Sequence, residues 1–389
     1  MCEIFINLKI LSYILNYAHY FSENGGLMIF EKIYENFKEL KEGNKKIIKE
    51  GLIDKDEALK LFKIDKWRDY LKLFDIASQV RDYFKKEIEI TSTIHITNIC
   101  KVNPKCVYCG FAAGTSKEGY YKPFRLSDEE IKKSAIAIEN SGICRVSCSS
   151  AHGYEGKEVL RALKIVKENT NLEVLVNAGA DLTEETIKEL KKYGIDTICC
   201  NLETTNENLF KKVKPGEELE DRIRVCKLVN KYDIELSSGL LIGIGESYED
   251  RVEHLFYLKN ELVVGEIPIM GFNPYKGTPM ENHPRCSALE QAKTIAITRL
   301  LFPNIRITSP TPTIGSELVQ FALLGGASNV ATVIPRNHPI NIKGVGNPKT
   351  GNLEKVVKLI KELGLTPKLN WEKFKKYLER YGNKMIVKL

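Results

Sequence analysis

The 389-residue sequence lacks an uninterrupted hydrophobic run long enough to cross a membrane. Its most apolar stretch, residues 4–21, is interrupted by two asparagines, a lysine and a histidine. A basic start followed by a small-residue cleavage site, the mark of a secretory signal, is missing too. We therefore expect a cytoplasmic protein without membrane contacts. Because glycine codons just before Met28 can read as a ribosome-binding sequence, we expect translation to start there, which makes residues 1–27 a mis-called extension.

Blocks of like charge, and arginines interleaved with aromatic residues, are also absent. The net charge of +7 comes from 58 Lys and Arg against 51 Asp and Glu. The lysines are spread along helical patterns, which is typical of a solvated surface and excludes a nucleic-acid-binding track. Disulfide frameworks belong to small secreted chains, so the 10 cysteines of this long chain are expected to be reduced thiols.

Three of these cysteines, Cys100, Cys106 and Cys109, lie in one loop-like segment after the β-branched run Thr91–Thr97. No fourth cysteine lies within thirty residues on either side. An iron–sulfur cluster normally takes four thiolates, so three leave one iron open, and open metal positions are where chemistry takes place. Tyr108, just before the last cysteine, suits a tight and partly dry cradle. The pattern predicts a reactive iron–sulfur cluster; the alternative of another class is a zinc or iron–sulfur site without catalysis.

The rest of the chain reads as helices followed by an α/β alternation. Hydrophobic residues recur at helical spacing over residues 29–86, and from about residue 92 short apolar runs alternate eight times with longer amphipathic stretches. The expected strands are residues 93–97, 144–148, 172–176, 197–201, 235–242, 267–271, 305–308 and 329–333. The expected helices include residues 128–139, 156–168, 183–193, 219–231, 248–258 and 288–301, with two more at 353–363 and 371–381.

Eight such alternations favour an α/β fold with a parallel (β/α)8, TIM-type barrel over a doubly wound sheet. We expect an N-terminal helical segment at residues 28–90, the barrel at 91–340 and a short C-terminal helical tail at 341–389. Active sites of such barrels lie at the C-terminal ends of the strands. The three-cysteine loop follows the first strand and therefore falls at that end.

Several ordered motifs carry a resemblance to a known family. They are Val80-Arg81-Asp82, Asn201-Leu202-Glu203-Thr204, and the stretches at residues 238–246, 273–279 and 325–329. With these motifs and the three cysteines, the chain resembles radical S-adenosylmethionine (SAM) enzymes of the biotin synthase type. That branch also contains the hydrogenase maturase HydE. The resemblance covers about residues 58–365, most of the chain.

This resemblance implies one [4Fe-4S] cluster held by Cys100, Cys106 and Cys109, with SAM bound to the fourth iron. One electron, delivered by a donor protein, would then cleave the sulfonium of SAM to a 5′-deoxyadenosyl radical. The radical would abstract a hydrogen atom from a small-molecule substrate. The protein's part is to hold cluster, SAM and substrate within reach and to exclude water. No residue is assigned a catalytic role toward the substrate.

The resemblance also assigns contacts to SAM residue by residue. Asn201 and Glu203 share one face after the fourth strand and would bind the ribose hydroxyls; the alternative is a polar strand end at a surface turn. Arg222 would pair with the methionyl carboxylate through its guanidinium fork. The alternative for Arg222 is a solvated helix arginine.

Three further contacts follow from the same resemblance. Gly243 would bring its backbone to the adenine, although its loop is no Rossmann fingerprint, because Tyr248 stands at the third glycine position. Ser147 lies where relatives receive the amino group of SAM, together with the serines at 149 and 150. Tyr108 would line the cofactor site.

The cysteine spacing departs from the usual pattern of the family. Three residues normally separate the first two cysteines and two the last pair, whereas here the numbers are five and two. This departure resembles the HmdB group of methanogens, which is linked to the iron-guanylylpyridinol cofactor of methenyltetrahydromethanopterin (Fe) hydrogenase. It implies a role in biosynthesis of that cofactor, with a pyridinol precursor as substrate. The alternative is a radical SAM lyase or mutase acting on an amino-acid-like substrate.

Biotin synthase itself holds a second, sacrificial cluster inside its barrel. The matching positions here are Ser147, Asn177, Ser237 and, approximately, Thr311, and none is a good soft ligand. Sulfur insertion is therefore not expected, unless a shift of one residue brings Cys148 into the barrel. The six cysteines outside the three-cysteine loop, from residue 144 to 286, are expected to be small buried hydrophobes.

Overall fold

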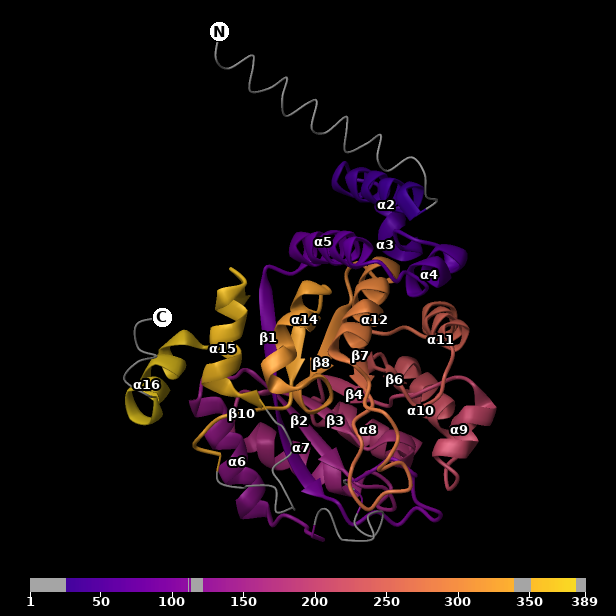
Figure 1. Ribbon diagram of the computed structural model, residues 1–389. Helices are drawn as coiled ribbons and strands as arrows, with labels where there is room; N and C mark the ends of the chain where they lie inside the picture. Colours follow the sequence, from indigo (N-terminus) through magenta and orange to yellow (C-terminus); the bar gives the residue numbers. More distant parts are fainter. Residues whose placement is uncertain (1–25, 111, 113–121, 339–350, 383–389) are drawn as a thin grey trace.

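The computed structural model describes residues 26–110, 112, 122–338 and 351–382. Of the predicted extension at residues 1–27, only the last two residues are described. The predicted boundary between barrel and tail at residue 341 lies outside the described residues. The strands form a barrel (Figure 1). It has eight parallel strand positions and closes where β1 pairs with both β2 and β9, which confirms the predicted (β/α)8 fold. The barrel strands are β1 (Glu87–Thr97), β2 (Arg145–Ser150), β3 (Glu173–Asn177), β4 (Thr197–Cys199), β5 (Glu235–Ser237), β6 (Leu240–Ile242), β7 (Glu266–Gly271), β8 (Arg306–Pro310) and β9 (Asn329–Ala331).

The fifth strand position is divided into β5 and β6, where the sequence predicted one continuous strand over residues 235–242. Gly239 lies in the break. A Cβ atom at this position would stand 1.9 Å from the carbonyl oxygen of Pro268 in β7, so only glycine allows the two segments to come this close. Both β5 and β6 pair with β7 in parallel, so the barrel stays closed.

Helices fill the intervals between strands at the predicted positions, because their N-terminal caps are encoded locally. Ser127 and Glu130 form a capping box, and the Thr183 hydroxyl accepts the Thr186 N–H. The short helices α9 (Glu207–Val213), α13 (Thr311–Ile314) and α14 (Val319–Leu324) were not among those expected. The helices of the barrel are α6 (Asp128–Asn140), α7 (Lys157–Asn169), α8 (Glu184–Lys192), α9 (Glu207–Val213), α10 (Leu219–Lys231), α11 (Tyr248–Glu261), α12 (Ala288–Leu301), α13 (Thr311–Ile314) and α14 (Val319–Leu324).

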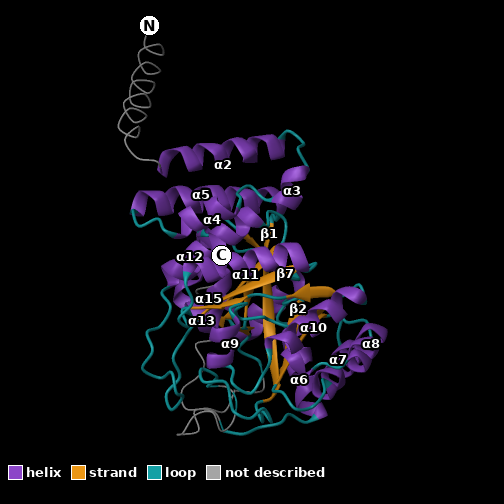
Figure 2. Cartoon of the chain, turned by 90° about the vertical axis from the view of Figure 1, so that its right-hand side faces the viewer, coloured by secondary structure: helices purple, strands orange, loops and turns teal. Residues whose placement is uncertain are grey.

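Four N-terminal helices cover the end of the barrel at which β1 begins (Figures 1 and 2). They are α2 (Gly26–Lys41), α3 (Lys46–Glu50), α4 (Lys55–Phe62) and α5 (Trp67–Phe84). Helices α4 and α5 pack on α12, and the Leu52 N–H donates to the Leu300 carbonyl at 2.7 Å. The buried guanidinium of Arg299 donates to the carbonyls of Gly326 and Ile305, which satisfies backbone groups beneath this cover.

The C-terminal segment is attached to the barrel by backbone pairing as well as by helices. Strand β12 (Thr366–Pro367) extends β1 in parallel, and β10 (Val333–Ile334) pairs with β11 (Gly351–Asn352). The two predicted tail helices are α15 (Leu353–Glu362), packed on α14, and α16 (Trp371–Tyr381), packed on α6. None of the described helices combines the length and the apolar character needed to cross a membrane.

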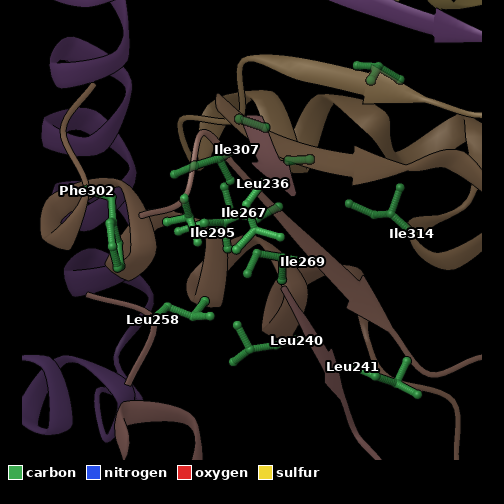
Figure 3. Close-up of a cluster of buried hydrophobic side chains, with 14 of the residues drawn as sticks. Leu236, Leu240, Leu241, Leu258, Ile267, Ile269, Ile295, Phe302, Ile307 and Ile314 are labelled. Carbon is green, nitrogen blue, oxygen red and sulfur yellow. The ribbon is translucent and has the colours of Figure 1, made fainter. Parts of the chain in front are cut away.

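The hydrophobic core lies between the barrel and its helices. Leu236, Ile267 and Ile307, from β5, β7 and β8, form one buried cluster with Ile295 of α12 (Figure 3). Burying a side chain of this size contributes about 1.5–3 kcal/mol relative to leaving it exposed. Because alternate residues of a strand face opposite sides, the remaining strand residues point into the barrel, and many of these are polar.

Charged residues fill the barrel at the end covered by the N-terminal helices, and we call this group the floor network. Arg145 Nη2 lies 2.8 Å from Glu266 Oε2, and Arg306 Nη1 lies 2.6 Å from Glu235 Oε1. Burial alone would raise the pKa of Glu266, but the two arginines outweigh it and hold that pKa below its usual value. The floor network consists of Glu89, Arg145, Glu173, Glu235, Glu266 and Arg306.

Candidate active site

The three-cysteine loop follows β1 at the barrel end opposite the N-terminal helices (Figure 1). At its start, the Asn98 side chain accepts the Phe124 N–H at 2.9 Å. Near its other end, the Val107 N–H donates to the carbonyl of Val213, the last residue of α9, at 3.0 Å. One side-chain and one backbone hydrogen bond therefore fix the loop near its two ends.

The turn after α9, residues 214–217, packs directly on this loop. A Cβ atom on Gly216 would stand 2.2 Å from the Pro104 carbonyl oxygen, so the turn needs glycine here. Lys214 Nζ lies 3.3 Å from Cys106 Sγ and 3.1 Å from Glu217 Oε1. Lys214 and Glu217 were missed by the sequence analysis, because a Lys-Pro-Gly-Glu turn normally reads as solvated surface. Their burial depends on the docking of two segments about a hundred residues apart in the sequence.

One cavity of about 290 Å³ lies beside these elements. Ser147 and Gly243, both predicted to contact SAM, are not among its lining residues. The cavity does bring together the other predicted site residues, whose contacts with cofactors remain predictions: Cys100, Cys106, Cys109, Tyr108, Asn201, Glu203 and Arg222.

Asn201 and Glu203 are held by the break between β5 and β6. The Asn201 Oδ1 accepts the Gly239 N–H at 3.0 Å, and Asn201 is buried, which does not fit a surface turn. Glu203 forms an isolated bridge with Leu240 and has a φ of +67°, in the left-handed region that non-glycine residues seldom adopt. Such strain costs about 1–3 kcal/mol and persists only where the surrounding structure fixes the conformation.

Arg222 is buried in the cavity wall and is not a solvated helix arginine. Its Nε and Nη2 donate to Glu217 Oε2 at 2.9 and 2.7 Å, and its Nη1 donates to the Asn201 carbonyl. Burial would raise the pKa of Glu217, but Arg222 and Lys214 hold it far below its usual range. We call Glu203, Lys214, Glu217 and Arg222 the mouth network. Glu217 thus already binds the guanidinium group of Arg222, which was predicted to pair with the methionyl carboxylate of SAM.

His152 also lines the cavity, with its Nδ1 at 3.5 Å from Glu217 Oε1. Burial lowers the pKa of His152 to about 4, although Glu217 opposes the shift. The imidazole is therefore neutral near pH 7.

The structure places Ser147 and Gly243 away from the lining of the cavity. Ser147 Oγ lies deeper in the barrel, 3.4 Å from the hydroxyl of Ser149, which does line the cavity. The Gly243 N–H donates to Glu246 Oε1 at 2.7 Å, and its carbonyl lies 3.0 Å from His283 Nε2. Both backbone polar groups of Gly243 are thus engaged within its own surroundings.

The shift of one residue that would bring Cys148 into the barrel does not occur. Cys148 pairs in the ladder with the buried Ile94 and Val176, whereas Ser147 pairs with Thr93 on the other face. The expectation of buried cysteines is confirmed for all but Cys144, which is half-buried: the buried ones are Cys148, Cys199, Cys200, Cys226 and Cys286.

The donor set fits an iron–sulfur cluster better than a single metal ion. Across the described residues, no three His, Cys, Asp or Glu side chains are close enough together to hold one ion. Thiols bound to separate irons of a cubane stand farther apart than the ligands of one ion, because each iron occupies a different corner. Cys100, Cys106 and Cys109 lie on one cavity, and sulfur is the donor that such clusters take.

The cluster, when bound, supplies the electron that cleaves SAM. The chain's own residues provide the rest of the site. The docked loop fixes the sulfur positions, the mouth network supplies paired charges at the cavity wall, and partly buried side chains such as Tyr108 limit the access of water.

Comparisons with known proteins agree with this site. The family model of the Radical SAM superfamily matches residues 94–258, and that of the Biotin and Thiamin Synthesis associated domain matches residues 268–366. An uncharacterized protein of Methanocaldococcus jannaschii is 85% identical, over 92% of this chain and 96% of its own. Biotin synthase of Clostridioides difficile is 33% identical, over 67% of this chain and 81% of its own.

A solved structure shares the fold. The crystal structure of methylornithine synthase is 20% identical and superposes with a TM-score of 0.73, over 86% of this chain and 99% of that one. Enzymes of the matched superfamily act on small substrates and take their electron from a donor. The chain belongs to the radical SAM superfamily, in its biotin-synthase-like branch, and works with a [4Fe-4S] cluster and SAM.

Proposed function

We propose that this radical SAM enzyme acts in biosynthesis of the iron-guanylylpyridinol cofactor of methenyltetrahydromethanopterin (Fe) hydrogenase, as the HmdB group does, with a pyridinol precursor as substrate. The observation that carries the proposal is the cysteine spacing, with five residues between Cys100 and Cys106 and two between Cys106 and Cys109. The longer first interval is accommodated by the docking of the loop on the turn after α9.

Two features argue against the sulfur insertion that the name of biotin synthase implies. The positions that would hold a second cluster are Ser147, Asn177, Ser237 and Thr311, which offer no thiolate. The nearest cysteine in β2, Cys148, lies on the opposite face of its strand. The similarity to biotin synthase therefore supports the proposed radical chemistry, but it does not support the same substrate.

The polar character of the cavity supports an uncharged ring as substrate. Among the described lining residues, the charged side chains are those of the mouth network, and they pair with one another. Neutral polar side chains, such as those of His95, Ser149 and Asn177, also line the cavity. Burial lowers the pKa of His95 to about 4, so its imidazole is neutral near pH 7. Such groups match the hydroxyl and carbonyl edges of a pyridinol.

The second candidate is a lyase or mutase for an amino-acid-like substrate, favoured by the shared fold of methylornithine synthase. Anaerobic incubation of the reconstituted protein with SAM and dithionite separates the two. We expect pyridinol precursors to stimulate formation of 5′-deoxyadenosine and to yield a modified pyridinol. Stimulation by α-amino acids, with none by pyridinols, would contradict the proposal and support the second candidate.

A further inference from the structure

The turn after α9 brings a buried lysine to one of the three cysteine sulfurs. Lys214 Nζ is 3.3 Å from Cys106 Sγ, 3.1 Å from Glu217 Oε1 and 5.4 Å from the centre of the Tyr108 ring. Its side chain is only 5% exposed. A buried ammonium group is costly unless it is paired, so these partners, and not water, determine where the charge lies.

Without Lys214, two negative groups would face each other at this point. Glu217 Oε1 lies 3.5 Å from Cys106 Sγ, and Cys106 becomes a thiolate when it binds iron. Arg222 donates to the other carboxylate oxygen, Oε2, and so compensates the far side of Glu217. Lys214 contacts both the sulfur and the near oxygen.

We propose that Lys214 tunes the [4Fe-4S] cluster: it donates a charge-assisted hydrogen bond to the Cys106 thiolate and thereby raises the reduction potential of the cluster. Reduction adds one electron, taken from the donor, and no proton moves. A fixed positive charge beside a ligand sulfur favours the more negative, reduced state, and hydrogen bonds to sulfur act in the same direction. Lys214 acts through Cys106 and is therefore a positioning residue. The inference rests on the cluster that the family uses, and not on the identity of the substrate.

Redox titration followed by electron paramagnetic resonance, without SAM or substrate, tests this role. Lys214→Met keeps the length of the side chain and removes its charge, while Lys214→Arg keeps the charge. Lys211→Met is the matched control, because Lys211 lies on α9 with its side chain 72% exposed and pairs with the exposed Glu218. Iron and acid-labile sulfide are measured in each variant.

We expect Lys214→Met to lower the ratio of reduced to oxidised cluster at a fixed potential about tenfold, or about 59 mV for a one-electron couple. Lys214→Arg and Lys211→Met should stay close to the wild type. Glu217→Gln, which removes the facing negative charge, should shift the potential in the opposite direction. This opposite sign is a result that a merely structural role would not produce.

Three results would overturn the proposal. The first is a full iron and sulfide content in Lys214→Met with an unchanged potential. The second is a shift of equal size in Lys214→Arg, because charge would then not be the cause. The third is failure of Lys214→Met to assemble a cluster while the other two lysine variants do, because Lys214 would then serve assembly and not tuning.

Discussion

The barrel carries a buried charge network at each end, and the two networks share their chemistry. In the floor network, Arg145 and Glu266 pair at 2.8 Å with side chains 3% and 2% exposed. In the mouth network, Arg222 and Glu217 pair at 2.7 Å with side chains 4% and 6% exposed. In both, arginine outweighs burial and holds the carboxylate pKa below its usual value. The surroundings differ: the mouth residues line the cavity, and the floor residues are not among its lining.

Although the ion pairs at the two ends of the barrel are alike, removing them should have different effects on the protein. The floor side chains contact each other and strand residues such as Thr308, so their removal changes the free energy of unfolding. The mouth side chains also contact a cysteine sulfur and the cavity wall, so we expect their removal to change cofactor binding. Substitutions at the two ends are expected to separate stability from cofactor chemistry.

The largest effect is expected from Cys106→Ala at the mouth. Loss of one of three thiolates leaves too few ligands for a stable cluster, so iron, acid-labile sulfide and 5′-deoxyadenosine formation should fall to background after anaerobic reconstitution. Cys144→Ala is the control, because Cys144 lies outside the cavity and its thiol donates to the Gly142 carbonyl. A complete, active cluster in Cys106→Ala would contradict the prediction that the cysteines at the mouth of the barrel hold the cluster.

At the floor, Glu266→Gln should destabilise the protein without abolishing its chemistry. Breaking a buried ion pair by removing one charge costs roughly 3 kcal/mol, because the partner charge stays buried. Urea denaturation and the thermal midpoint measure the loss. The comparison is Glu129→Gln, whose exposed pair with Lys133 should contribute almost nothing. Wild-type stability together with lost SAM cleavage in Glu266→Gln would reverse the assigned roles of the two ends.

A smaller effect is expected from Glu203→Gln in the mouth network. If the carboxylate accepts hydrogen bonds from the ribose, its neutralisation should weaken SAM binding about tenfold, the equivalent of 1.4 kcal/mol. Equilibrium dialysis against labelled SAM measures this, with the exposed Glu207→Gln on α9 as control. An unchanged dissociation constant would show that Glu203 does not contact SAM.

The smallest effect concerns pH. The pKa of Glu266 lies below its usual 4.5 because Arg145 and Arg306 outweigh burial. A lowered pKa stabilises the folded state above pH 4.5, and this contribution is lost as the pH falls through the folded-state value. The thermal midpoint of the wild type should therefore fall more steeply below pH 4.5 than that of Glu266→Gln. Parallel curves would show that the floor pair does not titrate as described.

Much of this fold could be predicted from the sequence, because its signals are local. Each apolar run and each amphipathic stretch is recognised within a few residues, and the structure confirms the barrel and most of the helices. The division of the fifth strand could not be read in the same way. It depends on the approach of Gly239 to Pro268 in the neighbouring strand, which no local pattern reports.

The site shows the same limit. The cysteines, Asn201 and Glu203 were found through motifs, and the structure brings them to one cavity. Lys214 and Glu217 were not found, because their function depends on docking against a loop about a hundred residues earlier in the sequence. The positive φ of Glu203 is likewise imposed by its bridge with Leu240 and has no signature in composition or spacing.

The most direct test of the central claim is the electron paramagnetic resonance spectrum of the anaerobically reduced protein before and after addition of SAM. The claim is that three cysteines at the mouth hold a cluster whose remaining iron takes SAM. The account predicts that SAM changes the signal of the reduced cluster in the wild type and equally in Glu266→Gln, where only the floor is altered. A cluster-loaded wild-type protein whose spectrum stays the same with saturating SAM would contradict it.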